Sequence, residues 1–404
     1  MPIKTWPEPL QAAFWQWGWL LPTVLPLAQI GGRALYTVLI GLYALWGLPC
    51  LWRRRDRLDR TTTTLYLALL GVMLIGIPGS VDPADGLRIW GQFAAQTLTL
   101  LLMQAALRES PAHPDRLLNA LAWFGALTLA GLYLLLPYHW LEITGRSFDP
   151  SSQLREDNLP FLLPFLLYWL WRQGDWRWRP AAMAGVTVVV VAYVVIAEGR
   201  AALLGLMVGL TVFCWLVLNW RLRWIAPLAA LALIASIAVH IEPFQKAKLD
   251  PDHPLDAFTT GRSILWRQAL AQPPARSWLG VGIGNEAHAT AVLSFAIGGQ
   301  PVQVKHLHNF LLDAWYETGI LGVGLLLGLI GTVLIRVARR WRRLTAGDRQ
   351  RAGVLLAAAL ALMTAGLLSF SHTSRQIACY LFICLGGLIS IAPSAHADTD
   401  RDRH

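Results

Sequence analysis

Two arginines lie in polar segments of a largely apolar chain, and their side chains suit an anionic substrate. Arg200 lies in a three-residue break between the apolar stretches 181–197 and 201–219. Arg262 opens a segment whose apolar residues recur at helical spacing. A guanidinium binds phosphate oxygens through two parallel hydrogen bonds, and the N-terminal amides of a helix also favour an anion. We therefore expect an anion site of the size of a diphosphate, with a simple ion pair between Arg200 and Glu198 as the alternative.

His308 is the candidate base. It precedes a segment that continues as an apolar helix, and a neutral imidazole accepts a proton from a hydroxyl near neutral pH. A purely structural histidine is the alternative. A metal held by His306, His308 and Asp313 is not expected, because their spacing matches no common zinc pattern. The four cysteines lie in or beside apolar stretches and are expected to be small core residues: Cys50, Cys214, Cys379 and Cys384.

The elements that must position these side chains are membrane helices. The chain has 404 residues, 55% hydrophobic and 14% charged, whereas soluble domains carry about 25% charged residues. Apolar stretches that suit membrane helices occur at 11–30, 34–52, 63–79, 88–107, 117–137, 158–171, 181–197, 201–219, 224–240, 318–336, 353–370 and 376–392. The stretch 158–171 is short, and a re-entrant segment is the alternative there. The sequence therefore predicts an all-α polytopic membrane protein with about twelve transmembrane helices, forming one domain over residues 1–404.

The basic residues predict the orientation. With the N-terminus in the cytoplasm, 22 of the 34 Lys and Arg residues fall on the cytoplasmic side, in short segments such as 53–60 and 336–351. The other side holds the longest loops but fewer basic residues, which is the positive-inside pattern. An even number of spans places both termini in the cytoplasm. This distribution accounts for the net charge of +10 without a nucleic-acid partner.

Two external loops are long enough to hold structure, at 138–157 and 241–307. The second is predicted to contain an amphipathic interfacial helix at 262–270, which ends before Pro273. A glycine-rich turn at 280–285 follows. It lacks the preceding strand and following helix of a nucleotide-binding loop. Arg200, Arg262 and His308 all fall on this external side.

At these positions the chain resembles the O-antigen ligase and polymerase family of bacterial surface-polysaccharide enzymes. The motifs that carry the resemblance are His308-Asn309 followed after nine residues by Gly319-Ile320-Leu321-Gly322, the segment Thr260–Trp266 with the turn Trp278–Gly282, and Gly199-Arg200-Ala201-Ala202-Leu203. Family members usually have a serine before that last arginine. Gly199 stands there in this chain, so any role of a hydroxyl is in doubt.

The resemblance implies a GT-C-like glycosyltransferase of the bacterial inner membrane with a periplasmic active site. Such ligases transfer a glycan from undecaprenyl diphosphate to a sugar hydroxyl of the lipid A–core oligosaccharide, with inversion and without metal, nucleotide or other cofactor. His308 would act on the acceptor hydroxyl, while Arg200 and Arg262 would hold the diphosphate. The resemblance further offers Arg155 and Lys305 for phosphate contact, and Asn309 for substrate contact and for orienting His308.

Three other functions stay open at this point. A polysaccharide polymerase uses the same donor with a second lipid-linked glycan as acceptor. A protein O-oligosaccharyltransferase of the same superfamily glycosylates Ser or Thr, often with an extended soluble C-terminal region. A lipid or glycan transporter would have charged or broken helices near the bilayer midplane, whereas the notable charges here lie at external ends of spans.

Overall fold

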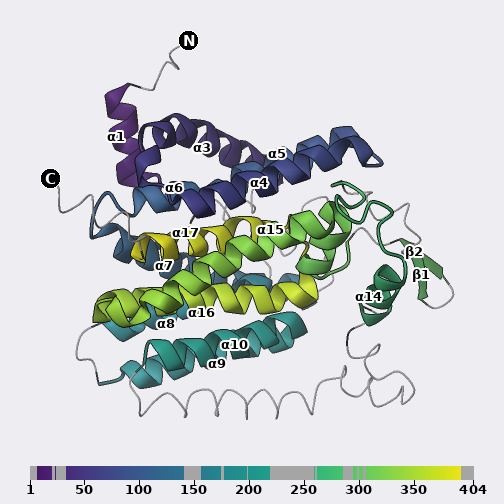
Figure 1. Ribbon diagram of the computed structural model, residues 1–404. Coiled ribbons are helices and arrows are strands. Elements are labelled where there is room, and N and C mark those ends of the chain that lie inside the picture. The colour runs from purple at the N-terminus through teal and green to yellow at the C-terminus, as the bar shows by residue number, and fades with distance from the viewer. Residues whose placement is uncertain are drawn as a thin grey trace.

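The computed structural model is mostly helical (Figure 1). It describes residues 7–20, 23, 33–140, 156–173, 177–197, 199–218, 259, 262–284, 294–297, 300–303 and 306–392. Six helices of this described part are long and apolar enough to cross a membrane: α3 (Arg33–Arg53), α4 (Arg60–Gly76), α7 (His113–Trp140), α9 (Arg179–Ile196), α15 (Phe310–Arg340) and α16 (Ala346–Ser369). The chain is therefore a polytopic, membrane-embedded helical protein.

The six helices coincide with six of the predicted spans. Three further stretches form the shorter helices α8 (Leu159–Arg172), α10 (Arg200–Leu216) and α17 (Phe382–Ile391). The stretch 88–107 is formed by α5 (Pro83–Thr97) and α6 (Thr99–Ala106), which meet at Leu98, whose backbone is itself in the helical region. Of the stretch 11–30, the structure describes only residues 11–20 and 23, which include most of α1 (Glu8–Trp17). The stretch 224–240 lies outside the described residues. Twelve spans thus stays a prediction.

The two loops also differ in detail from the prediction. The first does not begin at residue 138, since α7 continues to Trp140 and its helical backbone hydrogen bonds extend past the end of the apolar run. The second contains the predicted helix, α14 (Arg262–Ala271). It also contains a hairpin that an all-α prediction omits: β1 (Ser294–Ile297) pairs antiparallel with β2 (Gln300–Gln303), the only strands among the described residues.

Ion pairs join the helices at one end of the bundle, which we call the arginine-rich end. Asp115 at the start of α7 accepts from Arg172 of α8 at 2.6 Å and from Arg351 of α16 at 2.8 Å. Glu109, after α6, contacts Arg54 and Arg57 at 3.1 Å each. These arginines belong to the predicted cytoplasmic segments. The ion pairs therefore bring those segments together at one end of the bundle.

Asp59 is the most buried of the ion-paired carboxylates described at this end. Its Oδ2 lies 2.6 Å from Nη1 of Arg336 on α15, and its Oδ1 accepts the Thr62 amide at 2.9 Å as the N-cap of α4. Burial alone would raise the pKa of Asp59, but hydrogen bonds from Arg336 and Thr62 outweigh it and hold that pKa below its usual range. The carboxylate therefore links the start of α4 to the far end of α15.

Asp59→Asn is expected to lower the free energy of unfolding by about 3 kcal/mol, because it leaves Arg336 without its charge partner. Since the folded pKa is depressed, the ionised carboxylate stabilises the protein above its unfolded pKa of about 4, and this contribution is lost as pH falls through the lower folded value. Denaturant titration of the detergent-solubilised protein at several pH values measures both effects. The control is Asp56→Asn, an exposed neighbour, and equal stability of the two variants would contradict the assignment.

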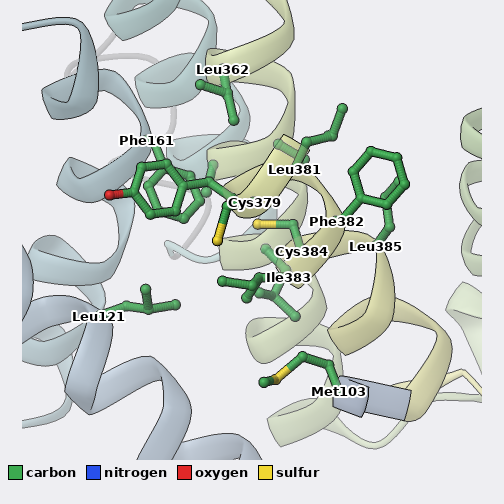
Figure 2. Packing of buried hydrophobic residues seen from close by; sticks show 14 of the residues in the cluster. Met103, Leu121, Phe161, Leu362, Cys379, Leu381, Phe382, Ile383, Cys384 and Leu385 are labelled. Atoms are coloured by element: carbon green, nitrogen blue, oxygen red, sulfur yellow. The ribbon is translucent and has the colours of Figure 1, made fainter. Parts of the chain in front are cut away.

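The centre of the bundle is formed by α17 and the preceding π-helix η8 (Gln376–Leu381). Figure 2 shows Cys379 and Cys384 packed among hydrophobic side chains from the surrounding helices, including Phe161 of α8. Phe161 also stacks on Tyr380, with ring centroids 4.5 Å apart. All four cysteines are buried and none of them forms a disulfide, which confirms that they are core residues.

Candidate active site

The end opposite the arginine-rich end is organised around a bend in α15. At Gly319 the backbone leaves the helical region, with φ 67° and ψ −168°, so α15 divides into a short first piece and a long second piece. A break in a membrane helix exposes backbone groups that need partners. Here the loop after α14 supplies them: Val281 N–H donates to Tyr316 O at 3.0 Å, and Ile320 N–H donates to Ser277 O at 3.0 Å.

Gly319 is required on two grounds. Its positive φ is unfavourable for any residue with a side chain, and an added Cβ would lie 2.3 Å from the carbonyl oxygen of Trp278. Gly280 and Gly282 of the opposing turn also have positive φ, at 69° and 91°. The glycine-rich turn thus packs against the bend of α15. This close packing explains why the motif after His308 has a glycine at position 319.

His308 immediately precedes α15 and adopts φ 54°, the only non-glycine residue with positive φ among those described. Such backbone strain concentrates at functional sites. Its Nδ1 lies 3.4 Å from the carbonyl oxygen of Ser369, at the end of α16. The His306 ring is 4.0 Å away between centroids. His308 is only partly buried.

The residues that follow His308 hold this conformation. Asn309 is the N-cap of α15, and its Oδ1 accepts from Leu311 N–H at 3.0 Å and Leu312 N–H at 3.1 Å. The buried carboxylate of Asp313 accepts from Leu307 N–H at 2.8 Å. Asn309 therefore acts on His308 through the backbone of the helix start, and its contact with substrate stays a prediction.

Arg262 reaches the same end of α16. Its Nη1 donates to the carbonyl oxygen of Leu368, one residue before the carbonyl near His308. Thr259 caps α14: its backbone oxygen accepts from Arg262 N–H at 3.2 Å and its hydroxyl from Ser263 N–H at 3.1 Å. These two amides are thus occupied, which leaves the guanidinium as the main candidate for an anion.

A hydrogen bond ties α14 to the His308 segment, since Trp266 Nε1 donates to Leu307 O at 2.8 Å. A small hydrophobic cluster supports this contact, with Leu265 and Ala269 of α14 packed near Leu307 and Tyr316. Arg262 and His308 are 46 positions apart in sequence, yet these contacts fix them as neighbours around one helix end.

Arg200 opens α10, directly after the predicted tight break, which the structure confirms between α9 and α10. Helices α10 and α16 pack closely, and a Cβ added at Gly205 would lie 3.2 Å from the Cβ of Ala365. Arg200 precedes Gly205 by five residues, about 7.5 Å of helix, and Ser369 follows Ala365 by four, about 6 Å. Because the helices run in opposite directions, Arg200 begins α10 at the level where α16 ends.

The structure therefore places Arg262 and His308 beside the last turn of α16, and it places the start of α10, with Arg200, at the same level. Arg155 and Lys305 lie outside the described residues, as does Glu198, the alternative partner of Arg200. Within the described part of the chain, no three His, Cys, Asp or Glu side chains are grouped to hold a metal ion.

Sequence reasoning missed one feature of this end. Glu317 and His372 are both buried, and His372 Nε2 lies 3.7 Å from Glu317 Oε2. The sequence does contain a polar break at Ser371–Arg375, between two apolar stretches. This break is similar to the one around Arg200 and could have drawn attention to His372. A lone histidine in such a break does not reveal its own burial.

Comparison with known proteins agrees with the motifs. Residues 185–327 match the family model described as O-antigen ligase, and this segment contains Arg200, Arg262 and His308. No curated protein matches the chain. The family match supports assignment to the O-antigen ligase family of glycosyltransferase-like membrane enzymes, which act on lipid-linked glycans.

Proposed function

We propose that this membrane protein, with its O-antigen ligase segment at 185–327, transfers a glycan from undecaprenyl diphosphate to a hydroxyl of the lipid A–core oligosaccharide. The observation that carries the proposal is the contact of Arg262 and His308 with consecutive carbonyls, Leu368 and Ser369, at the end of α16. A cation suited to a diphosphate and a base suited to a hydroxyl thus share one helix end.

In the proposed reaction, His308 donates Nδ1–H to Ser369 O, which leaves the lone pair on Nε2 for the acceptor hydroxyl. As Nε2 takes the proton, the hydroxyl oxygen forms a bond to the anomeric carbon. The bond from that carbon to the diphosphate oxygen breaks, the electron pair leaves with the diphosphate, and the configuration inverts. Such general-base assistance typically contributes 10²–10⁴-fold in rate.

Arg262 and Arg200 bind the diphosphate in this scheme and stabilise the negative charge that grows as it departs. Electrostatic stabilisation of this kind is usually the largest contribution to catalysis. Neither metal nor cofactor is part of the proposal. Arg155 and Lys305 are further candidates for phosphate contact.

The arginine-rich end is proposed to lie in the cytoplasm, with the site at the periplasmic face of a bacterial inner membrane. The ion-paired arginines at that end support this orientation. A twelve-span, GT-C-like arrangement with both termini in the cytoplasm belongs to the same proposal.

Reconstitution tests the function. The purified protein in liposomes is supplied with an undecaprenyl-diphosphate glycan and purified lipid A–core, with and without a chelator. We expect a glycan-linked lipid A–core in both cases, detected by gel mobility and mass. A lipid-linked polymer formed in place of that product would identify a polymerase and reject the ligase proposal.

A further inference from the structure

We propose that Glu317 and His372 form a positioning pair, which holds the bend of α15 against the loop after α16 and so keeps the Ser369 carbonyl beside His308. The inference rests on the proposed function. It assigns no substrate contact to either residue.

The pair is buried between two elements. Glu317 is 5% exposed and lies two residues before Gly319, while His372 is 2% exposed and lies three residues after Ser369. Placing two ionisable side chains inside a membrane protein is costly, and such residues are functional by default. Their 3.7 Å approach joins the bend of α15 to the segment that ends α16.

Glu317 is at the centre of the bend. Its backbone carbonyl accepts from Gly282 N–H at 3.0 Å, and a Cβ added at Gly280 would lie 2.5 Å from that same oxygen. The side chain of Glu317 is therefore attached to the backbone position where the glycine-rich turn meets α15. A shift of this carboxylate would disturb the break on which the start of α15, and hence His308, depends.

His372 is held on its other side by α5, where its ring meets the Phe93 ring at 6.0 Å and 60°. The chain between Ser369 and His372 is short, and α16 ends with Phe370 N–H donating to Gly366 O. Because only two residues separate Ser369 from His372, the contacts that hold His372 also restrain the end of α16. The carbonyl oxygens of the last two residues of that helix, Leu368 and Ser369, contact the Arg262 guanidinium and the His308 imidazole respectively.

A positioning role makes a specific kinetic prediction. A displacement of about 1 Å far from the chemistry can cost 10²-fold in rate, whereas substrate binding by other residues would be little changed. We therefore expect His372→Leu to lower kcat by about tenfold or more, with KM nearly unchanged. His372→Gln, which retains an N–H near Nε2, should restore much of that loss.

The test compares His372→Leu, His372→Gln, Glu317→Leu and the Glu317→Leu/His372→Leu double variant in the reconstituted reaction. His113→Leu is the matched control, because His113 is also buried but its Nδ1–H donates to Ala106 O near the arginine-rich end. Its kcat per folded protein should equal that of the wild type. The double variant should be no slower than the slower single variant, since it leaves no ionisable group buried alone.

Wild-type kcat in His372→Leu, or an equal loss of kcat in His113→Leu, would overturn the positioning role while the ligase activity stands. Failure of the wild type to transfer any glycan would instead reject the proposed function. The melting temperatures of the same variants form a double-mutant cycle that does not depend on activity. Additive changes in melting temperature would reject the pair itself.

Discussion

His308→Ala is expected to abolish detectable glycan attachment to lipid A–core while the amount of protein in the membrane stays normal. The alanine removes the only group proposed to accept the hydroxyl proton, and loss of a general base typically costs 10²–10⁴-fold. Attachment is measured by gel mobility of lipopolysaccharide in cells and by initial rates in liposomes. Protein level is measured in the same membranes.

Two further variants separate chemistry from folding. His308 has φ 54°, a conformation that glycine adopts without strain, so His308→Gly should be at least as well folded as His308→Ala and equally inactive. His306→Ala removes the neighbouring ring, 4.0 Å away, and should retain activity. Normal attachment in His308→Ala cells would refute the role of His308 as base.

Arg262→Lys is expected to lower kcat/KM by about 10- to 150-fold. The lysine keeps the positive charge but loses the planar fork that binds two phosphate oxygens, and one hydrogen bond to a charged group is worth about 1.5–3 kcal/mol, each 1.4 kcal/mol being tenfold. The measurement is the rate of transfer at limiting donor concentration.

The matched control is Arg267→Lys on the same helix, since Arg267 is exposed and one turn further along α14. It should transfer glycan at the wild-type rate. If Arg262→Lys were equally active, two-point recognition of the diphosphate by that guanidinium would be wrong, and a single positive charge would suffice.

The features that local sequence determines were predicted well. The break before Arg200, the helix that opens at Arg262 and the turn at 280–285 follow from apolar runs, prolines and glycines within a few residues. The bend at Gly319 was not predicted, because its cause is a partner about 40 residues earlier in the chain. The apolar stretch 318–336 contains five glycines, and its pattern does not indicate which of them a loop packs against.

Residues whose role depends on distant contacts were the harder ones. His372 carries no local mark of burial, and nothing in the stretch 88–107 marks Leu98 as the point where α5 and α6 meet. Asn309, which was predicted to orient His308, is by contrast a residue whose observed role depends on a local contact. Its capping of α15 is a local interaction that the pattern of an asparagine before an apolar helix already indicates.

The end of α16 has an electrostatic consequence of its own. The aligned peptide dipoles of a helix leave about half a negative charge at its C-terminus, and the carbonyls of Leu368 and Ser369 are part of that negative pole. It attracts the guanidinium of Arg262 and, in the proposed reaction, stabilises the positive charge that the imidazole of His308 gains during proton transfer. A helix with no charged side chain in its last turn thereby supplies a counter-charge for both the cation and the base.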